Sequence, residues 1–269
     1  MLRKPAVADM FYPGDENRLR AQVESFLRPV PEPKTALAAI SPHAGYIYSG
    51  GVAGAVFSQI RIPPTVVILG PNHRGIGAPV AISASGVWDM PLGSVLINEG
   101  LAKSILEAGS DCKIDDDPQA HALEHSLEVQ VPFLQILRPD VTIVPLALSR
   151  VDYKRCQEIG LALAKGIKHY AKEVLVVAST DMTHYESQEV ARANDQAAID
   201  KIVDLDPRGL YDTVTQNQIS MCGVIPTTIT LVACKALGAT QANLVKYATS
   251  GDVTGDYAQV VGYAGCTVY

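Results

Sequence analysis

The sequence predicts an α/β fold in three layers, with a mostly parallel central sheet covered by helices on both faces. The chain contains three short apolar runs, at residues 36–41, 65–70 and 174–178. Runs of this length and β-branched content, bounded by proline, glycine or polar residues, are typical of buried parallel strands. Helical patterns alternate with these strands along the chain, and that alternation favours a parallel sheet with helices on its faces.

Length and composition narrow the class of protein. The 269 residues contain no internal repeat and no low-complexity linker, so we expect one domain over residues 1–269. The net charge of −6 and the absence of a Lys/Arg cluster argue against nucleic acid or an anionic membrane surface as the main partner. There is no run of about 18 uncharged apolar residues and no signal-peptide pattern, so we expect a cytoplasmic protein without a transmembrane helix.

The first half of the chain reads as short elements separated by proline, glycine and capping residues. In order, we expect a turn-rich segment at 9–15, an amphipathic helix at 19–27, a proline-rich link at 29–33, a strand at 36–41, a helix at 49–60, a strand at 65–70, short strands within 79–97 and a helix at 99–108. Ser49 is the predicted N-cap of the second helix, because serine accepts hydrogen bonds from the first turn.

The second half continues the alternation of strands and helices. We expect helices at 126–137, 153–170, 188–203, from 206 onward and at 226–237, and strands at 141–148, 174–178, 243–247 and 260–268. Asp206 and Pro207 suit the N-cap and first position of a helix, and Gly238 suits the position after a helix end. The last two strands have no helix between them, so we expect them to pair antiparallel.

Three of the six histidines follow strand ends. His43 and His73 come directly after the first two strands, and Asp181 and His184 come after the strand at 174–178. Ligands bind beyond the carboxyl ends of strands in open α/β sheets, and crossover connections place successive parallel strands side by side or one strand apart. The sequence therefore predicts a metal centre or a catalytic cluster. Asp181 and His184 can be ligands, or His184 can act as acid and base with Asp181 as its partner.

Of the five scattered cysteines, Cys222 is the predicted ligand. It precedes the helix expected to begin at Pro226, and a helix N-terminus lowers the pKa of a thiol. Cys112 precedes an acidic run that disfavours the thiolate, and the remaining three fall within predicted core elements: Cys156, Cys234 and Cys266. No CxxC pair occurs, which excludes a zinc ribbon or a thioredoxin motif.

Residues 121–125 read HALEH and contain the H-x-x-E-H pattern of inverzincin zinc proteases. That pattern needs a helix with both histidines on one face, so zinc hydrolysis through His121, Glu124 and His125 is one interpretation. In the other, His125 and Glu128 begin the helix and face the cleft, while His121 is a solvated loop residue. Arg74, next to His73, either pairs with an anionic substrate or is a solvated side chain.

The ordered motifs resemble those of the Memo family, which is named for the human mediator of ErbB-receptor-driven cell motility. They are SPHAGY at 41–46, LGPNH at 69–73, EHSLE at 124–128, STDMTH at 179–184 and CG at 222–223, with Phe11-Tyr12 and YATS at 247–250 as further blocks. The resemblance covers essentially the whole chain.

The resemblance implies a fold similar to class III extradiol ring-cleaving dioxygenases, which hold non-haem iron with two histidines and a carboxylate. It implies that His43 and His73 are metal ligands and that His184 is the acid/base. Cys222 stands where the dioxygenases have glutamate. A thiolate softens the site towards copper, zinc or thiolate-bound iron, so we do not expect ring cleavage.

The leading hypothesis is a cytoplasmic metal-binding protein, with His43, His73 and Cys222 around iron or copper, or alternatively zinc. Asp181 and His184 line the same cleft, and His125 and Glu128 support it. The catalytic candidates for oxidoreductase chemistry on a small molecule are His184, Asp181 and His125. The alternative is a peptide-binding module without turnover. In that case Arg74, Phe11 and Tyr12 would be the residues that contact the peptide. The resemblance also implies radical-SAM and AMMECR-type proteins as partners.

Overall fold

The computed structural model describes residues 1–28 and 30–269, so Pro29 of the expected link lies outside the described residues. Within these residues one mixed sheet of twelve strands runs in the order β1-β5-β6-β8-β3-β9-β2-β12-β10, with β11 beside β12, β4 beside β8 and β7 beside β4. The strands are β1 (Leu2–Arg3), β2 (Ala38–Ser41), β3 (Thr65–Pro71), β4 (Val80–Ile82), β5 (Val87–Trp88), β6 (Val95–Ile97), β7 (Asp115–Asp116), β8 (Thr142–Leu148), β9 (Leu175–Ser179), β10 (His184–Glu186), β11 (Ala242–Thr249) and β12 (Val260–Val268). The central strands β6, β8, β3, β9 and β2 are parallel to one another.

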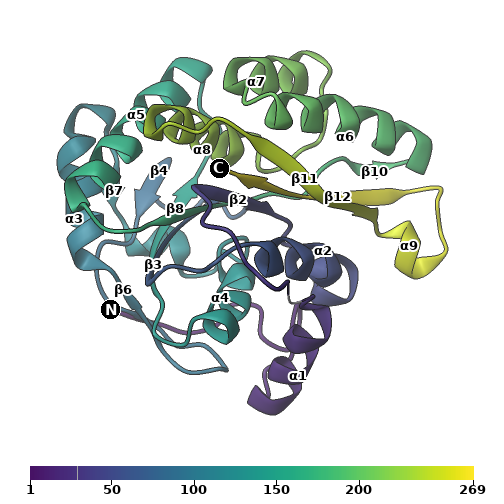
Figure 1. Ribbon diagram of the computed structural model, residues 1–269, viewed down its shortest axis with the longest axis horizontal. Helices are drawn as coiled ribbons and strands as arrows, with labels where there is room; N and C mark the ends of the chain where they lie inside the picture. Colours follow the sequence, from purple (N-terminus) through teal and green to yellow (C-terminus); the bar gives the residue numbers. More distant parts are fainter. Residues whose placement is uncertain (29) are drawn as a thin grey trace.

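Helices cover both faces of this sheet (Figure 1). They are α1 (Glu16–Phe26), α2 (Tyr46–Gln59), α3 (Glu99–Ala108), α4 (Val131–Leu137), α5 (Tyr153–Tyr170), α6 (Gln188–Val203), α7 (Pro207–Gln216), α8 (Val224–Leu237) and the short α9 (Gly251–Thr254). One face carries α1, α2 and α4, and the other carries α3, α5, α6, α7 and α8. The three-layer α/β architecture predicted from the sequence is confirmed.

The central strands are apolar along both faces because each face packs against helices. In β3, Val66 and Ile68 join the core beneath α2 and α4, whereas Val67 and Leu69 join the core beneath α5 and α8. All four side chains are fully buried. This double coverage explains why the strand appears in the sequence as a continuous apolar run rather than as an alternating one.

The strand order places the predicted site residues at one edge of the sheet. Strand β9 lies between β2 and β3 and is parallel to both. The carboxyl ends of these strands therefore meet, and His43, His73 and Asp181 follow them within a few residues. The prediction that the first two strands lie side by side or one strand apart is confirmed.

Most predicted boundaries agree with the structure, and α3, α5 and α6 begin and end at the predicted residues. Strands β11 and β12 pair antiparallel, as expected. The predicted N-cap at Ser49 is wrong, because α2 begins at Tyr46, and the Ser49 hydroxyl donates to the carbonyl of Ala44 instead. The helix expected from residue 126 begins as a 3-10 turn, and α4 starts at Val131.

Within the described residues, no helix combines the length and the apolar content needed to cross a lipid bilayer.

Close contact between α5 and α8 sets the position of α8, whose first turn follows Cys222. A Cβ atom at Gly160 of α5 would lie 2.6 Å from the Val232 Cβ and 2.8 Å from the carbonyl oxygen of Ile229, both in α8. We predict that Gly160→Ala forces the helices apart and lowers the free energy of unfolding by about 1–3 kcal/mol in urea titrations.

Gly100→Ala is the matched control, because a Cβ there meets its nearest neighbours at 3.6 and 3.7 Å within helix α3. The free energy of unfolding of this variant should exceed that of wild type by no more than about 1 kcal/mol. Equal effects of the two substitutions would contradict the assignment of Gly160 as a helix-contact position.

Candidate metal centre

The structure brings His43, His73 and Cys222 together. One potential ligand atom from each lies within 4.8 Å of the others. The His43 Nε2 is 3.3 Å from the Cys222 Sγ, and the ring centroids of His43 and His73 are 5.2 Å apart. These side chains come from the ends of β2 and β3 and from the turn before α8. These three side chains could hold a metal ion, and metal binding itself stays a prediction.

The imidazole of His43 is held in one tautomer by its neighbours. Its Nδ1 lies 2.9 Å from the Ser179 hydroxyl, which donates its own proton to the carbonyl of Ser126 at 2.6 Å. Ser179 must therefore accept from the Nδ1–H of His43. The lone pair of His43 is then on Nε2, the atom that faces Cys222.

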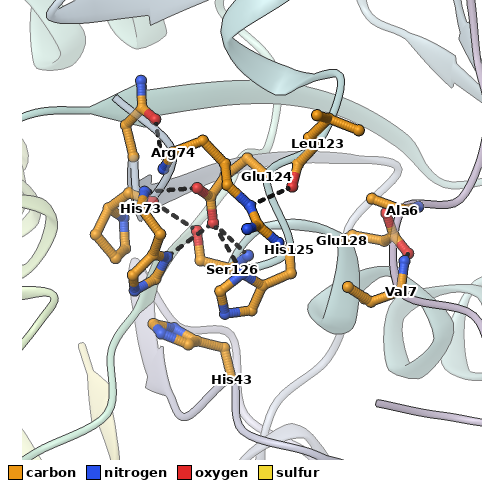
Figure 2. Close-up of polar contacts among 12 residues, drawn as sticks. Ala6, Val7, His43, His73, Arg74, Leu123, Glu124, His125, Ser126 and Glu128 are labelled. Carbon is orange, nitrogen blue, oxygen red and sulfur yellow. Dashed lines mark hydrogen bonds and ion pairs between the residues drawn. The ribbon is translucent and has the colours of Figure 1, made fainter. Parts of the chain in front are cut away.

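His73 is oriented by Glu124, the glutamate of the H-x-x-E-H pattern. Glu124 is fully buried and accepts from the His73 Nδ1 at 2.9 Å and from its backbone N–H at 2.6 Å (Figure 2). It also accepts from the backbone N–H of Ser126 at 2.8 Å. Burial raises the pKa of Glu124, but these hydrogen bonds and the nearby His73 and His125 outweigh it and lower the pKa to about 2. Nε2 of His73 is left free as a ligand atom.

His125 forms the wall behind His73. The two rings stack with centroids 4.5 Å apart, and Phe11 packs on His125 at 4.8 Å. The His125 Nδ1 is 3.4 Å from the Glu124 carboxylate, and burial, together with His73 and Arg74, lowers the pKa of His125 to about 4. His73, Glu124 and His125 form a second group with ligand spacing. Because Glu124 already accepts three hydrogen bonds, this group suits orientation of His73 better than metal binding.

Asp181 ties the turns after β2 and β9 together. Its carboxylate accepts from the His43 backbone N–H at 2.7 Å, and its own backbone N–H lies 3.3 Å from the Cys222 Sγ. Burial raises the pKa of Asp181, partly offset by the N–H groups of His43 and Ala44. The next residue after Cys222 is Gly223, where any side chain would collide with Thr180. This close approach holds the sulfur beside Asp181.

The expectation that a helix N-terminus lowers the pKa of Cys222 is wrong. Burial raises the pKa of this thiol, and the adjacent Asp181 carboxylate raises it further. In the protein without a cation Cys222 is therefore protonated. Its partner imidazole is neutral, because burial and the neighbouring histidines hold the pKa of His43 well below 6.5.

His184 lies at the start of β10, close enough to His43 and Asp181 to affect the pKa values of both. Its Nδ1 is 2.9 Å from the carbonyl oxygen of Ser220, which can only accept. The hydroxyl of Ser220 accepts from the His184 backbone N–H at 2.7 Å. His184 is thus fixed as the Nδ1–H tautomer, with a basic Nε2.

This donor set fits a transition metal ion. It offers two imidazoles, each with Nδ1 engaged and Nε2 free, and one thiol that a cation would deprotonate. The pairing of each histidine with an acceptor on its other nitrogen is the usual arrangement around metal-bound histidines.

A cleft of about 650 Å³ opens beside His73 and Cys222. One wall follows the ends of β3 and β8, and the other is formed by the end of α7, the connecting loop and the start of α8. A volume of this size is typical of small-molecule sites.

The prediction that His121 is a solvated loop residue is wrong. Its side chain is 1% exposed, its ring lies 6.1 Å from the Trp88 ring, and its ring nitrogens lack hydrogen-bond partners among the described residues. Residues 118–121 form a 3-10 helix rather than the α-helix that H-x-x-E-H requires, and His121 belongs to neither ligand group. Zinc hydrolysis through His121, Glu124 and His125 is therefore not supported by the geometry.

Glu128 anchors the N-terminal segment and does not reach the cleft. It pairs with Arg3 at 2.7 Å, accepts from the backbone N–H groups of Ala6 and Val7, and accepts from the Tyr12 hydroxyl. Tyr12 is consequently buried rather than available to a peptide. The segment supports the site through Phe11, which packs on His125.

Known proteins match this chain over nearly its whole length. A family model described as Memo-like protein matches residues 3–267. A MEMO1 family protein of Methanopyrus kandleri is 44% identical, over 98% of this chain and 98% of its own length. Proteins of the same description from Methanothermobacter thermautotrophicus and Aquifex aeolicus are each 41% identical, over 98% of this chain and 99% and 98% of their own lengths.

The role of Glu124 as a positioning residue gives one prediction. Glu124→Gln removes the charge and leaves one acceptor oxygen for three N–H donors, so His73 loses its fixed orientation. We expect the affinity for Co²⁺, followed by the thiolate absorption of the complex, to fall roughly 10- to 100-fold. Glu107→Gln, an exposed glutamate on α3, is the control and should bind Co²⁺ as wild type does.

Buried His121 predicts an acid-sensitive fold. Burial, followed by the charge of Arg3, lowers its pKa from 6.5 to about 4. Between these pH values the unfolded chain binds more protons, so stability rises with pH across that window. In EDTA, wild type should lose about 2 kcal/mol more than His121→Phe between pH 7 and pH 5, measured by urea unfolding. Equal losses would show that His121 does not carry this sensitivity.

Proposed function

The chain belongs to the Memo family, and on that premise we propose that it is a metal-dependent oxidoreductase acting on a small molecule. His43, His73 and Cys222 would bind an iron or copper ion at the edge of the sheet. The observation that carries the proposal is the meeting of their ligand atoms within 4.8 Å beside an open cleft.

The donor set supports a redox metal. Two imidazoles and a thiolate suit copper, zinc and thiolate-bound iron, and of these iron and copper change oxidation state under cellular conditions. When bound, such an ion supplies a Lewis acid and a one-electron couple next to the cleft. Asp181 is not counted among the proposed ligands, because one of its carboxylate oxygens accepts from the backbone N–H of His43.

The residues of the chain supply positioning and proton transfer. The Nε2 of His184 is the basic nitrogen, because its Nδ1–H is donated to the carbonyl oxygen of Ser220. His184 does not line the cleft itself, but it contacts Ser220 of the cleft wall. We propose that it takes or gives a proton at a substrate that extends past this wall to the metal ligands. Asp181 holds the His43 backbone in place, and His125 with Phe11 closes the side of the site behind His73.

We also propose that the scaffold is related to that of class III extradiol dioxygenases. Supporting this relation are the parallel central strands and the histidines that follow β2 and β3. Cys222 in place of a carboxylate puts an oxidisable ligand in the site, so the proposed chemistry is redox chemistry other than ring cleavage.

Metal analysis tests the proposal. Protein purified without oxygen should carry close to one equivalent of iron or copper by mass spectrometry, and His73→Ala should lose most of it because two donors bind an ion far more weakly than three. His169→Ala removes an exposed histidine on α5 and should keep the wild-type content. Equal metal content in all three proteins would reject the site.

Chelation separates the proposed enzyme from a peptide-binding module. A metal-dependent enzyme loses activity in EDTA, whereas a peptide-binding module keeps its affinity. Peptide binding that survives EDTA, in a protein whose wild type and His73→Ala forms carry no metal, would replace the present proposal with the binding function.

A further inference from the structure

We propose that the cleft binds an organic anion, with Arg150 as the residue that holds the anionic group. This inference rests on the proposed function, because it names the substrate class for the same site. The cleft walls differ in charge from the protein as a whole.

The protein is acidic, with a net charge of −6, but the residues that line the cleft include no aspartate or glutamate. Arg150 is the one lysine or arginine among them, and His73 is the one histidine. A cleft with this lining concentrates positive potential at a single point in an otherwise negative molecule, and such a point attracts anionic ligands.

Arg150 is free to take a ligand. Its side chain is exposed, and no ion pair or hydrogen bond to it is found among the described residues. The neighbouring carboxylate of Asp152 caps helix α5 by accepting from the backbone N–H of Arg155. A guanidinium without a partner presents planar N–H donors that match a carboxylate or phosphate in a two-point hydrogen bond.

The position of Arg150 also fits a substrate site. It follows β8, the neighbour of β3 in the sheet, so it lies beyond the carboxyl end of a central strand, as His73 does. Ligands of open α/β sheets bind in this crevice. A molecule held at Arg150 by its anionic end can extend along the cleft towards His73 and Cys222.

The remaining lining is mixed, and its apolar part indicates an apolar body for this molecule. Polar side chains such as Asn72 and Gln218 also line the cleft. The apolar side chains are Leu148, Val214, Ile219, Met221, Val224 and Ile225. The cleft volume of about 650 Å³ holds a compact ring system with room for water. The ligand class is therefore an organic carboxylate or phosphate with an apolar, ring-sized body.

Arg74, the arginine that the sequence analysis considered for this role, is a poor candidate. Its Nε donates to the carbonyl oxygen of Leu123 at 3.3 Å (Figure 2). Arg74 is also not among the residues that line the cleft. Arg74 is exposed, like Arg150, and this makes it a matched control.

The test compares 2-naphthoate with 2-naphthamide, which share a ring system but differ in charge. Binding is measured in EDTA by amide chemical shifts of ¹⁵N-labelled protein, so that no metal ion can hold the carboxylate. Wild type should bind naphthoate roughly tenfold more tightly than naphthamide, as expected for one exposed charge-assisted hydrogen bond. The shifts should centre on residues 148–150 and 218–222, and added salt should weaken the preference.

Arg150→Gln should remove the preference for naphthoate, and Arg74→Gln should keep it. A preference retained in Arg150→Gln, a preference lost in Arg74→Gln, or no binding of naphthoate by wild type would each overturn the inference. Because the assay contains EDTA, absence of a resident metal would contradict the proposed function without affecting this result. Loss of the anion preference alone would leave the metal analysis standing.

Discussion

The site depends on the insertion of β9 between β2 and β3. Parallel strands in adjacent positions end at the same edge of the sheet, so the residues that follow them share one volume. His43, His73 and Asp181 are far apart along the chain, yet this strand order brings the turns that carry them together. The turn before helix α8 contributes Cys222, whose sulfur lies beside His43. The packing of α8 against α5 fixes the position of this turn.

Close imidazoles and the burial around His43 set the charge of the site. Protonation of one ring disfavours protonation of the next, and burial disfavours the charged forms of His43 and His125. The pKa values of His43 and His125 are accordingly lowered, while those of Asp181 and Cys222 are raised. The pocket around His43 therefore favours neutral groups. Neutral nitrogen donors with free lone pairs are suited to coordinate a cation. Glu124 is the exception, because its hydrogen bonds to His73 and Ser126 stabilise its charge.

Features that depend on short-range chemistry could be predicted from the sequence, and features that depend on tertiary contacts could not. Strand runs, helix caps such as Asp206 and the strand-end histidines are local signals, and they located the elements and the site. The burial of His121 follows from its packing near Trp88 and the N-terminal strand. These residues are distant in the sequence, so the residues around His121 do not predict its burial. The raised pKa of Cys222 follows from its burial and, second, from Asp181, a residue 41 positions away. Arg150 has no motif around it and becomes significant only when the lining of the cleft is known.

The protonated state of Cys222 connects the pocket to metal chemistry. A thiol beside a carboxylate and within a neutral pocket is a poor nucleophile and a poor target for oxidation, because the thiolate is the reactive form. Metal binding replaces that proton, so the same burial that protects the free thiol makes metal affinity depend on pH. The backbone N–H of Asp181, 3.3 Å from the sulfur, is already placed to stabilise the thiolate once the proton has left. The fold thus holds the thiol in an unreactive form, and in the proposed metal-bound state the carboxylate that raises the pKa of the thiol would lie next to a positive charge.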